Sequence, residues 1–213
     1  IISSYSAHPV VLDTDVMELS RDYPGYFTDH LEQSGQFSMA MFFAGMVGSH
    51  TVAPMPVDNY VKADSIGKGL STLILEKSND LIYYDNQDMA CENLDIHMPK
   101  SQVRITRTLA IRSWLFELLL GPLNADIRII RIGNLLLLGT PCDFSGEIAV
   151  NSHFDSLAAS RSLDLMITSF NGNFIGYISE DYHYDKSVSE EVTLMNWTGP
   201  YMGTYFSWII NSV

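Results

Sequence analysis

Charged side chains are scarce in this sequence, and basic ones are the scarcest. Only 17% of the 213 residues are charged, against about 25% in an average soluble domain. The 12 Lys and Arg residues face 25 Asp and Glu residues, which gives a net charge of −13. This balance repels phosphate backbones and anionic surfaces, so we expect no nucleic-acid partner. Hydrophobic residues make up 46% of the chain, which excludes disorder and predicts extensive covered surface.

Long apolar runs and cysteines are also lacking. The longest uninterrupted apolar stretch, Met39 to Ala44, is far shorter than the roughly 20 residues that cross a bilayer. Cys91 and Cys142 are too few for a disulfide framework or a thiolate zinc cluster, and they fit either redox compartment. The chain begins without Met and without a signal region, so we expect it to be a piece of a longer polypeptide.

Two kinds of segment alternate along the chain, which predicts an α/β fold, with α+β as the alternative: a layered mixed sheet with flanking helices. No linker rich in Pro, Gly and Ser divides the sequence, so we expect one domain over residues 1–213. Runs of β-branched and aromatic residues predict strands at Ile2 to Leu12, Gln36 to Ala44, Ala90 to Met98, Asp126 to Ile132, Leu135 to Leu138 and Leu165 to Phe170. Amphipathic runs predict helices at Tyr26 to Gln33, Val61 to Lys77, Thr108 to Leu120, Ser145 to Ala159 and Met202 to Ile210.

A hairpin and a polar turn follow one another between Asp126 and Gly146. Gly133-Asn134 tolerates positive φ, which predicts a hairpin between the strands on either side. Leu135 to Leu138 has no polar side chain and should be buried on both faces. It leads into the turn Gly139 to Gly146, where Ser145 can cap the next helix. Polar side chains at the end of a buried strand are where many α/β enzymes place their chemistry.

Two polar residues near the N-terminus are candidates for function. His8 precedes Pro9, which forces an extended conformation and presents the imidazole at a strand end. A lone histidine is more often structural, so a functional role for His8 needs partners. Asp22 lies in the loop before a predicted helix and could orient a neighbouring histidine or cap the helix, and capping is the better reading of the residue alone.

A glycine-containing turn, Gly45 to Thr51, follows another predicted strand. Ser49 or Thr51 could supply a nucleophile, a donor to an oxyanion, or only hydrogen bonds within the turn. The turn matches neither the Walker phosphate loop nor the Gly-x-Ser-x-Gly elbow, which disfavours nucleotide binding and the α/β-hydrolase mechanism.

Asp143 and Tyr177 follow two further predicted strands. Asp143 is costly to bury unless it meets a metal, a cation or several donors, and its structural alternative is a cap of the helix near Ser145. Tyr177 is either a core or rim residue or a metal ligand. Because the ends of parallel strands share one rim, these residues and His8 could converge.

The order of these motifs resembles the catalytic domain of the neutral, non-lysosomal ceramidase family, and in particular its divergent bacterial members. The resemblance extends over nearly the whole chain. It is carried by five short motifs, Ser6 to Leu12, Ser20 to Gly25, Phe43 to Thr51, Gly139 to Gly146 and Asn171 to Ser179. The family hydrolyses the amide bond of N-acyl sphingoid lipids with one zinc ion held by two histidines, a glutamate and a tyrosine. The resemblance therefore implies the C-terminal portion of such a domain, acting as a zinc-dependent hydrolase of an amide or ester bond.

The resemblance also implies roles for individual residues. His8 matches the second zinc histidine, Asp143 the glutamate and Tyr177 the tyrosine, which makes these three the predicted metal ligands. Thr51 and Ser49 stand at the serine and aspartate positions of the family's turn, and they form the predicted catalytic set with Asp22. Glu191 stands where the family carries a substrate-contacting tyrosine, so Gly48 and Glu191 are the predicted substrate-binding residues. Asp22 or Glu191 would accept the proton of a metal-activated water.

Three departures from the family keep a second interpretation open. The family's first zinc histidine lies in a His-Thr-His-Ser segment upstream of His8, and the 213 residues contain no such segment. Asp143 is one methylene shorter than glutamate, and the turn Gly48 to Thr51 is largely rewritten. The alternative is a metal-free binding protein that kept the fold and lost catalysis.

The aromatic C-terminal region predicts a further contact. Residues from Trp197 to Trp208 indicate a buried surface against a missing N-terminal part or another subunit. Members of the family are usually exported, so the resemblance implies a periplasmic or secreted protein that acts on a lipid or another small molecule.

Overall fold

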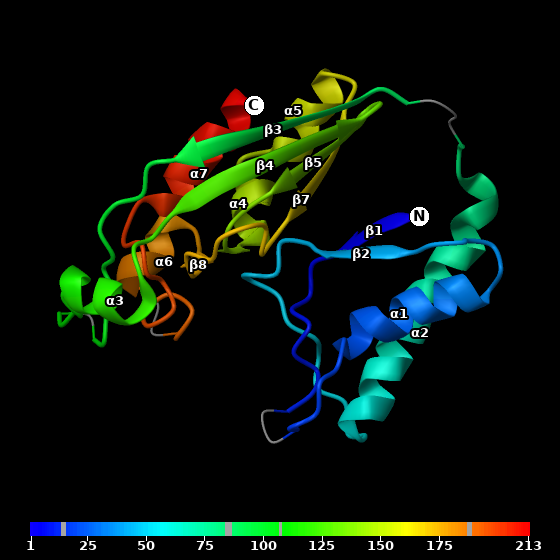
Figure 1. Cartoon of the computed structure of the whole chain (residues 1–213), viewed down its shortest axis with the longest axis horizontal. Helices are drawn as coiled ribbons and strands as arrows, with labels where there is room; N and C mark the ends of the chain where they lie inside the picture. The colour runs from blue at the N-terminus through cyan, green and yellow to red at the C-terminus, as the bar shows by residue number, and fades with distance from the viewer. Residues whose placement is uncertain (14–15, 84–86, 107, 187–188) are drawn as a thin grey trace. The chain divides into compact units, whose positions relative to one another are not determined.

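The computed structural model describes residues 1–13, 16–83, 87–106, 108–186 and 189–213 (Figure 1). The chain forms two compact units. The first unit comprises Ile1–Ala44 and Thr51–Asn86, and the second comprises Gly45–His50 and Gln87–Val213. Both units combine helices with strands in layers, so the predicted mixed α/β class is confirmed. The expectation of one domain over residues 1–213 stays a prediction.

The first unit packs two helices beside a short parallel strand pair. Its elements are β1 (Ile2–Tyr5), α1 (Asp22–Gln33), β2 (Met41–Ala44), α2 (Asn59–Lys77) and the 3₁₀ helix η1 (Ser78–Asp80). Strand β1 pairs in parallel with β2, and the Asp58 carboxylate caps α2 by accepting from the backbone N–H of Tyr60 and Val61. Apolar side chains of α1, including Phe27 and Leu31, are buried against β2 and α2.

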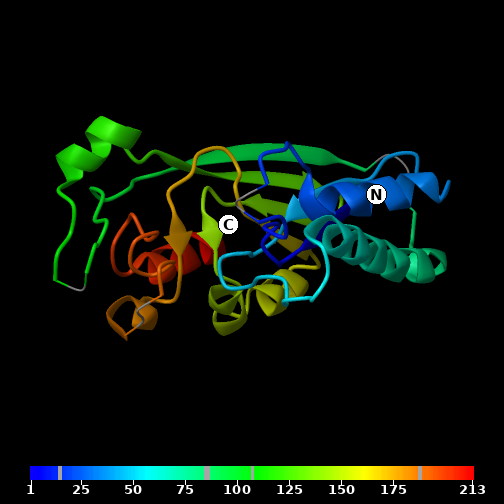
Figure 2. The same ribbon diagram turned by 90° about the horizontal axis from the view of Figure 1, so that it is seen from below.

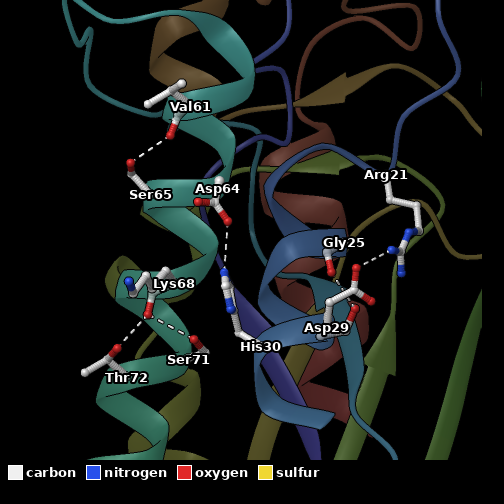
Figure 3. Close-up of polar contacts among 11 residues, drawn as sticks. Arg21, Gly25, Asp29, His30, Val61, Asp64, Ser65, Lys68, Ser71 and Thr72 are labelled. Atoms are coloured by element: carbon white, nitrogen blue, oxygen red, sulfur yellow. Dashed lines mark hydrogen bonds and ion pairs between the residues drawn. The ribbon is translucent and has the colours of Figure 1, made fainter. Parts of the chain in front are cut away.

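Helices α1 and α2 approach each other closely. His30 on α1 contacts Asp64 on α2, with 2.9 Å between Nε2 and Oδ1 (Figure 3). Gly67 provides the room for this packing, because a Cβ there would lie 2.6 Å from the backbone nitrogen of Phe27 and 2.6 Å from the Cβ of Tyr26. Gly69, two residues further along α2, has open space around it.

The second unit contains a four-stranded mixed sheet. Its strands are β3 (Met89–Ile96), β4 (Ala125–Ile132), β5 (Leu135–Gly139) and β7 (Asp164–Thr168), and this is also their order in the sheet. The β3–β4 and β4–β5 pairs are antiparallel and the β5–β7 pair is parallel, so the hairpin predicted at Gly133-Asn134 is confirmed. Leu137 and Leu138 of β5 are buried, whereas Leu135 and Leu136 are half-buried.

Three helices cover one face of this sheet. They are α4 (Gly146–Asn151), α5 (Phe154–Ser160) and α7 (Met202–Ser212), and they lie on the same side of the strands in Figure 2. The buried core contains Ile127 and Ile167 from the sheet together with Ile148, Phe154 and Phe206 from the helices. The remaining elements are α3 (Ser113–Leu120), the paired strands β6 (Asp143–Phe144) and β8 (Tyr177–Ile178), and α6 (Asp181–Lys186).

Several predicted boundaries differ from the structure for local reasons. The strand predicted to reach Leu12 ends at Tyr5, because the chain turns at His8, whose carbonyl accepts from the Val10 N–H at 2.9 Å. The helix predicted from Ser145 to Ala159 is two helices, separated where His153 adopts the left-handed region with φ 54°. The helix predicted from Thr108 begins only at Ser113, because Arg104 and Ala110 form an antiparallel bridge.

Two other sequence-level observations concern the membrane and the cysteines. Within the described ranges, none of the helices combines the length and apolarity needed to cross a membrane. Cys91 is exposed, Cys142 is buried, and both are free thiols.

We expect Gly67→Ala to destabilise the protein and Gly69→Ala to stabilise it. The new methyl group at position 67 would force α1 and α2 apart, at about 1–3 kcal/mol of unfolding free energy. At position 69 the methyl group meets nothing, so the gain in helix propensity of about 0.5–1 kcal/mol remains. Urea unfolding of the two variants checks this, and equal effects at both positions would contradict the tight helix crossing.

Candidate active site

Asp143 and Tyr177 face each other across the short parallel pair of β6 and β8. The register aligns Asp143 with Tyr177 and Phe144 with Ile178. Backbone hydrogen bonds hold this register, because the Asp143 N–H donates to the Gly176 carbonyl at 3.1 Å. Asp143 is only 2% exposed, and its carboxylate accepts a hydrogen bond from the Tyr177 hydroxyl. The structure therefore brings two of the three predicted metal ligands into contact.

The surroundings of Tyr177 keep its hydroxyl protonated. Burial, the largest cause, raises the pKa of Tyr177 to about 12, and the negative charges of Asp143 and Glu191 add to the effect. Glu191 is exposed and follows α6 in the chain. Its assignment as a substrate-binding residue stays a prediction. At neutral pH Tyr177 is therefore a neutral phenol that donates a hydrogen bond to the Asp143 carboxylate.

The segment Gly45–His50 packs directly against β6. The Gly48 N–H donates to the Phe144 carbonyl at 2.9 Å, and Val47 forms an antiparallel bridge with Ser145. A Cβ at position 48 would overlap the Asp143 carbonyl oxygen and lie 2.8 Å from its carbonyl carbon. Gly48 therefore permits the close approach of the two backbones, and its amide is already engaged rather than directed at a substrate carbonyl.

Ser49 and His50 form a hydrogen-bonded pair at the exposed end of this segment. The Ser49 Oγ lies 2.9 Å from the His50 Nδ1 and accepts from the Gly146 N–H at 3.0 Å. Ser145 caps α4 as predicted, accepting from the Glu147 N–H at 3.3 Å. His50 was not among the predicted site residues, although its position directly after Ser49 was an available signal. The pair places a hydroxyl beside an imidazole.

The backbone on both sides of His8 is fixed within the first unit. The buried Tyr23 hydroxyl donates to the Ala7 carbonyl at 2.5 Å, and His8 itself forms a parallel bridge with Thr51. Asp22 Oδ2 accepts from the N–H groups of Val11 and Leu12 at 2.9 and 3.1 Å. Thr51, one of the predicted catalytic residues, is therefore the backbone pairing partner of His8.

Asp22 is the first residue of α1, and the N-cap position belongs to Arg21. Asp22 stands at the start of α1 with φ 52°, and its Oδ1 accepts from the Tyr23 N–H at 2.6 Å. Together with the two contacts to Val11 and Leu12, its carboxylate accepts three backbone N–H groups. Asp22 thus connects the start of α1 to the loop that follows His8, and its role in orienting a histidine stays a prediction. A carboxylate with these partners is a positioning group.

No metal cluster can be recognised from acidic, histidine and cysteine side chains alone. Within the described part of the chain, no group of three or more His, Cys, Asp or Glu side chains lies close enough to hold a metal ion. The Asp143–Tyr177 pair falls outside that criterion because one of its members is a phenol. Zinc as a cofactor stays a prediction.

Comparison with solved structures places this fold in a known class. The chain is similar to the crystal structure of neutral ceramidase from Pseudomonas aeruginosa, with a TM-score of 0.76 and 14% sequence identity, covering 99% of this chain and 42% of that one. It is also similar to a ceramidase complexed with C2, with a TM-score of 0.72, 12% identity, and coverage of 99% and 44%. The chain thus has a ceramidase-like fold and spans less than half the length of these ceramidases. No protein-family model matches the sequence, and no curated protein matches it.

We expect Asp143→Asn to lower the pKa of Tyr177 from about 12 toward its ordinary value of 10, because the variant removes a charge and a carboxylate acceptor. Since the folded-state pKa exceeds the unfolded one, the associated stability is fully present below pH 10 and is lost as pH rises through 12. The titration is followed by NMR of ¹³C-labelled tyrosine, with Tyr177→Phe identifying the signal. Glu191→Gln should give a smaller decrease, and an unchanged pKa in Asp143→Asn would contradict the contact.

Proposed function

We propose that this chain is the part of a zinc-dependent hydrolase that carries two oxygen ligands of the metal, and that the enzyme cleaves an amide or ester bond of a lipid. The observation that supports the proposal is the buried Asp143 carboxylate in register with Tyr177, at the end of a short strand pair in a ceramidase-like fold. The same resemblance supports a periplasmic or secreted location. The ceramidase-like fold alone does not decide the chemistry, because one fold can host many functions.

The donor set of this pair fits zinc. Carboxylate oxygen is an established zinc ligand at about 2.0–2.2 Å, and a tyrosine hydroxyl offers a second oxygen once it releases its proton. Both groups project from adjacent strands whose register is held by backbone hydrogen bonds, so they are preorganised. His8 belongs to the first unit, and its assignment as a nitrogen ligand stays a prediction from the sequence resemblance.

Zinc, when bound, would lower the pKa of a coordinated water to about 7 and polarise the carbonyl under attack. The chain's own residues then have three tasks. Asp143 and Tyr177 hold position, because both belong to paired strands. Glu191 places an exposed carboxylate near Tyr177, where it could accept a proton. Ser49 offers a hydroxyl beside His50 that can donate to a developing oxyanion.

The test is metal content and zinc affinity of the full-length protein, purified without chelator. We expect near-stoichiometric zinc in the parent protein. In Asp143→Asn, Tyr177→Phe and His8→Ala the affinity should fall by at least about 100-fold, since loss of a direct ligand exceeds the effect of an outer-shell change. Hydrolysis of N-acyl lipids should fall in the same variants.

Asp155→Asn is the matched control, because Asp155 is an exposed carboxylate on α5. It should bind zinc as the parent does. Circular dichroism and thermal unfolding show whether each variant remains folded. Absence of zinc from the parent protein, after supplementation, would contradict the hydrolase and favour the alternative of a metal-free binding protein that kept the fold.

A further inference from the structure

The segment that joins β3 to β4 has a net positive charge in an otherwise acidic sequence. Residues 96–125 contain four basic residues and one acidic residue, a net charge of +3, while the rest of the chain carries −16. The four are Lys100, Arg104, Arg107 and Arg112, and the acidic one is Glu117. The local charge matters more than the total at a binding surface, because salt screens charges beyond about 8–10 Å.

Helix α3 exposes nearly all of its apolar side chains. Its sequence, Ser113–Leu120, has a single charged residue, and only Phe116 is buried. Leu118 and Leu119 are 73% and 72% exposed, and Trp114 is 60% exposed. Leu115, Leu120 and the nearby Ile105 and Leu109 are also exposed. A contiguous apolar surface of this kind marks an interaction site rather than ordinary surface.

This apolar helix is held in place on the second unit. Phe116 packs edge-on against Trp197, with ring centroids 5.4 Å apart, and the Gln102 N–H donates to the Trp197 carbonyl at 2.8 Å. Arg104 stacks on Tyr184 at 3.5 Å, and its guanidinium donates to the carbonyls of Tyr184 and Val192 at 2.7 and 3.0 Å. Helix α3 belongs to the connection between β3 and β4, which extends beyond one end of the sheet (Figure 1). The contacts of Phe116 and Arg104 fix this connection, so the exposed side chains of α3 are held in place.

A hollow of about 500 Å³, lined by both polar and apolar residues, lies at the N-terminal end of α3. Its wall includes two guanidinium groups and several hydroxyl groups, which are the groups that bind phosphate oxygens. They belong to Arg104, Arg112, Ser101, Thr108, Ser113 and Tyr184. Among the described residues, the buried Ser101 Oγ and Arg104 Nε have no hydrogen-bond partner. An apolar helix thus adjoins a hollow equipped for an anionic headgroup.

We propose that α3, together with residues 100–106 and 108–112, forms a docking surface for a lipid bilayer that contains anionic phospholipids. Trp114, Leu118 and Leu119 would enter the boundary between headgroups and acyl chains, where tryptophan is favoured. Arg112 and Lys100 would contact the headgroup phosphates, with the hollow receiving one of them. A second copy of the chain fits this surface less well, because a two-fold interface would bring two basic segments together.

Docking at α3 would reach the candidate active site through Trp197. The Trp197 ring packs on Phe116 of α3, and the ring would lie 3.1 Å from a Cβ at Gly176, the residue before Tyr177. The surface and the Asp143–Tyr177 pair therefore belong to one continuously packed region of the second unit. This step rests on the proposed function, because a bilayer would present the lipid substrate there, whereas vesicle binding itself needs neither zinc nor turnover.

The experiment is co-sedimentation of the purified full-length protein with vesicles of phosphatidylcholine alone or mixed equally with phosphatidylglycerol. We expect binding to the mixed vesicles, weakened by high salt, and a blue shift of tryptophan emission that Trp114→Phe abolishes. Leu118→Ser with Leu119→Ser should weaken binding by about tenfold or more, because each change removes buried apolar area. Arg112→Glu should weaken it by about tenfold through lost attraction.

Leu73→Ser is the matched control, because Leu73 is 60% exposed on α2 of the first unit. It should bind vesicles as the parent does, and Asp143→Asn should also bind them even if it loses zinc. Parent protein that ignores both vesicle types would overturn the proposal. So would α3 variants that bind as the parent does, or that change only the oligomeric state in solution, which would assign the surface to a second copy.

Discussion

The close approach of two backbones at Gly48 and Asp143 determines how the second unit presents its polar groups. No side chain fits at position 48, because a Cβ would overlap the Asp143 carbonyl. The glycine lets segment Gly45–His50 donate to the Phe144 carbonyl, while the Ser169 hydroxyl donates to the Gly45 carbonyl at 2.7 Å. Strand β6 is thereby held on one side by this segment and on the other by β8. The position of the Asp143 carboxylate therefore depends on both segment Gly45–His50 and β8.

The same device, a buried polar group that fixes a neighbouring backbone, recurs in the first unit. Tyr23 holds the Ala7 carbonyl, and burial raises the pKa of the Tyr23 hydroxyl well above its ordinary value. Asp22 holds the amides of Val11 and Leu12. The backbone on either side of His8 is thus held by residues at the start of α1, so it has less conformational entropy to lose if His8 binds a ligand. In both units the residues that hold the backbone are different from the candidate site residue, which is His8 in the first unit and Asp143 in the second.

Local sequence predicted those parts of the fold that local physics decides. The β4–β5 hairpin followed from alternation and a Gly-Asn turn, and α2 was predicted within two residues because its apolar spacing is helical. Strands β6 and β8 have two residues each, so no periodicity can reveal them, and their register comes from contacts between residues 34 apart. The break at His153 was equally hidden, since histidine is enriched at positive φ but most histidines do not adopt it.

The residues of the candidate site likewise fall into those that the sequence could reveal and those that depend on tertiary packing. Asp143 and Tyr177 could be singled out because each follows a strand at a polar turn, and the expectation that parallel strand ends meet was correct for this pair. The Ser49–His50 contact and the three amides on Asp22 could not be derived, because they depend on side-chain rotamers and on loops whose paths tertiary packing sets. Arg104 was missed for a further reason. An arginine is expected to be exposed to solvent. Here, stacking on Tyr184 and hydrogen bonds to two carbonyl groups offset the free energy of desolvating the Arg104 guanidinium.

Stability alone does not explain the Asp143–Tyr177 pair. A carboxylate that is 2% exposed is expensive to desolvate, and the phenol beside it returns only part of that free energy. Replacing such a pair by apolar residues of similar volume is often neutral or stabilising. The backbone register of β6 and β8 needs neither side chain, because its hydrogen bonds run through main-chain atoms such as the Asp143 N–H and the Gly176 carbonyl. Stability therefore gives little reason for a carboxylate and a phenol at these positions, and both are groups that the proposed zinc site would use.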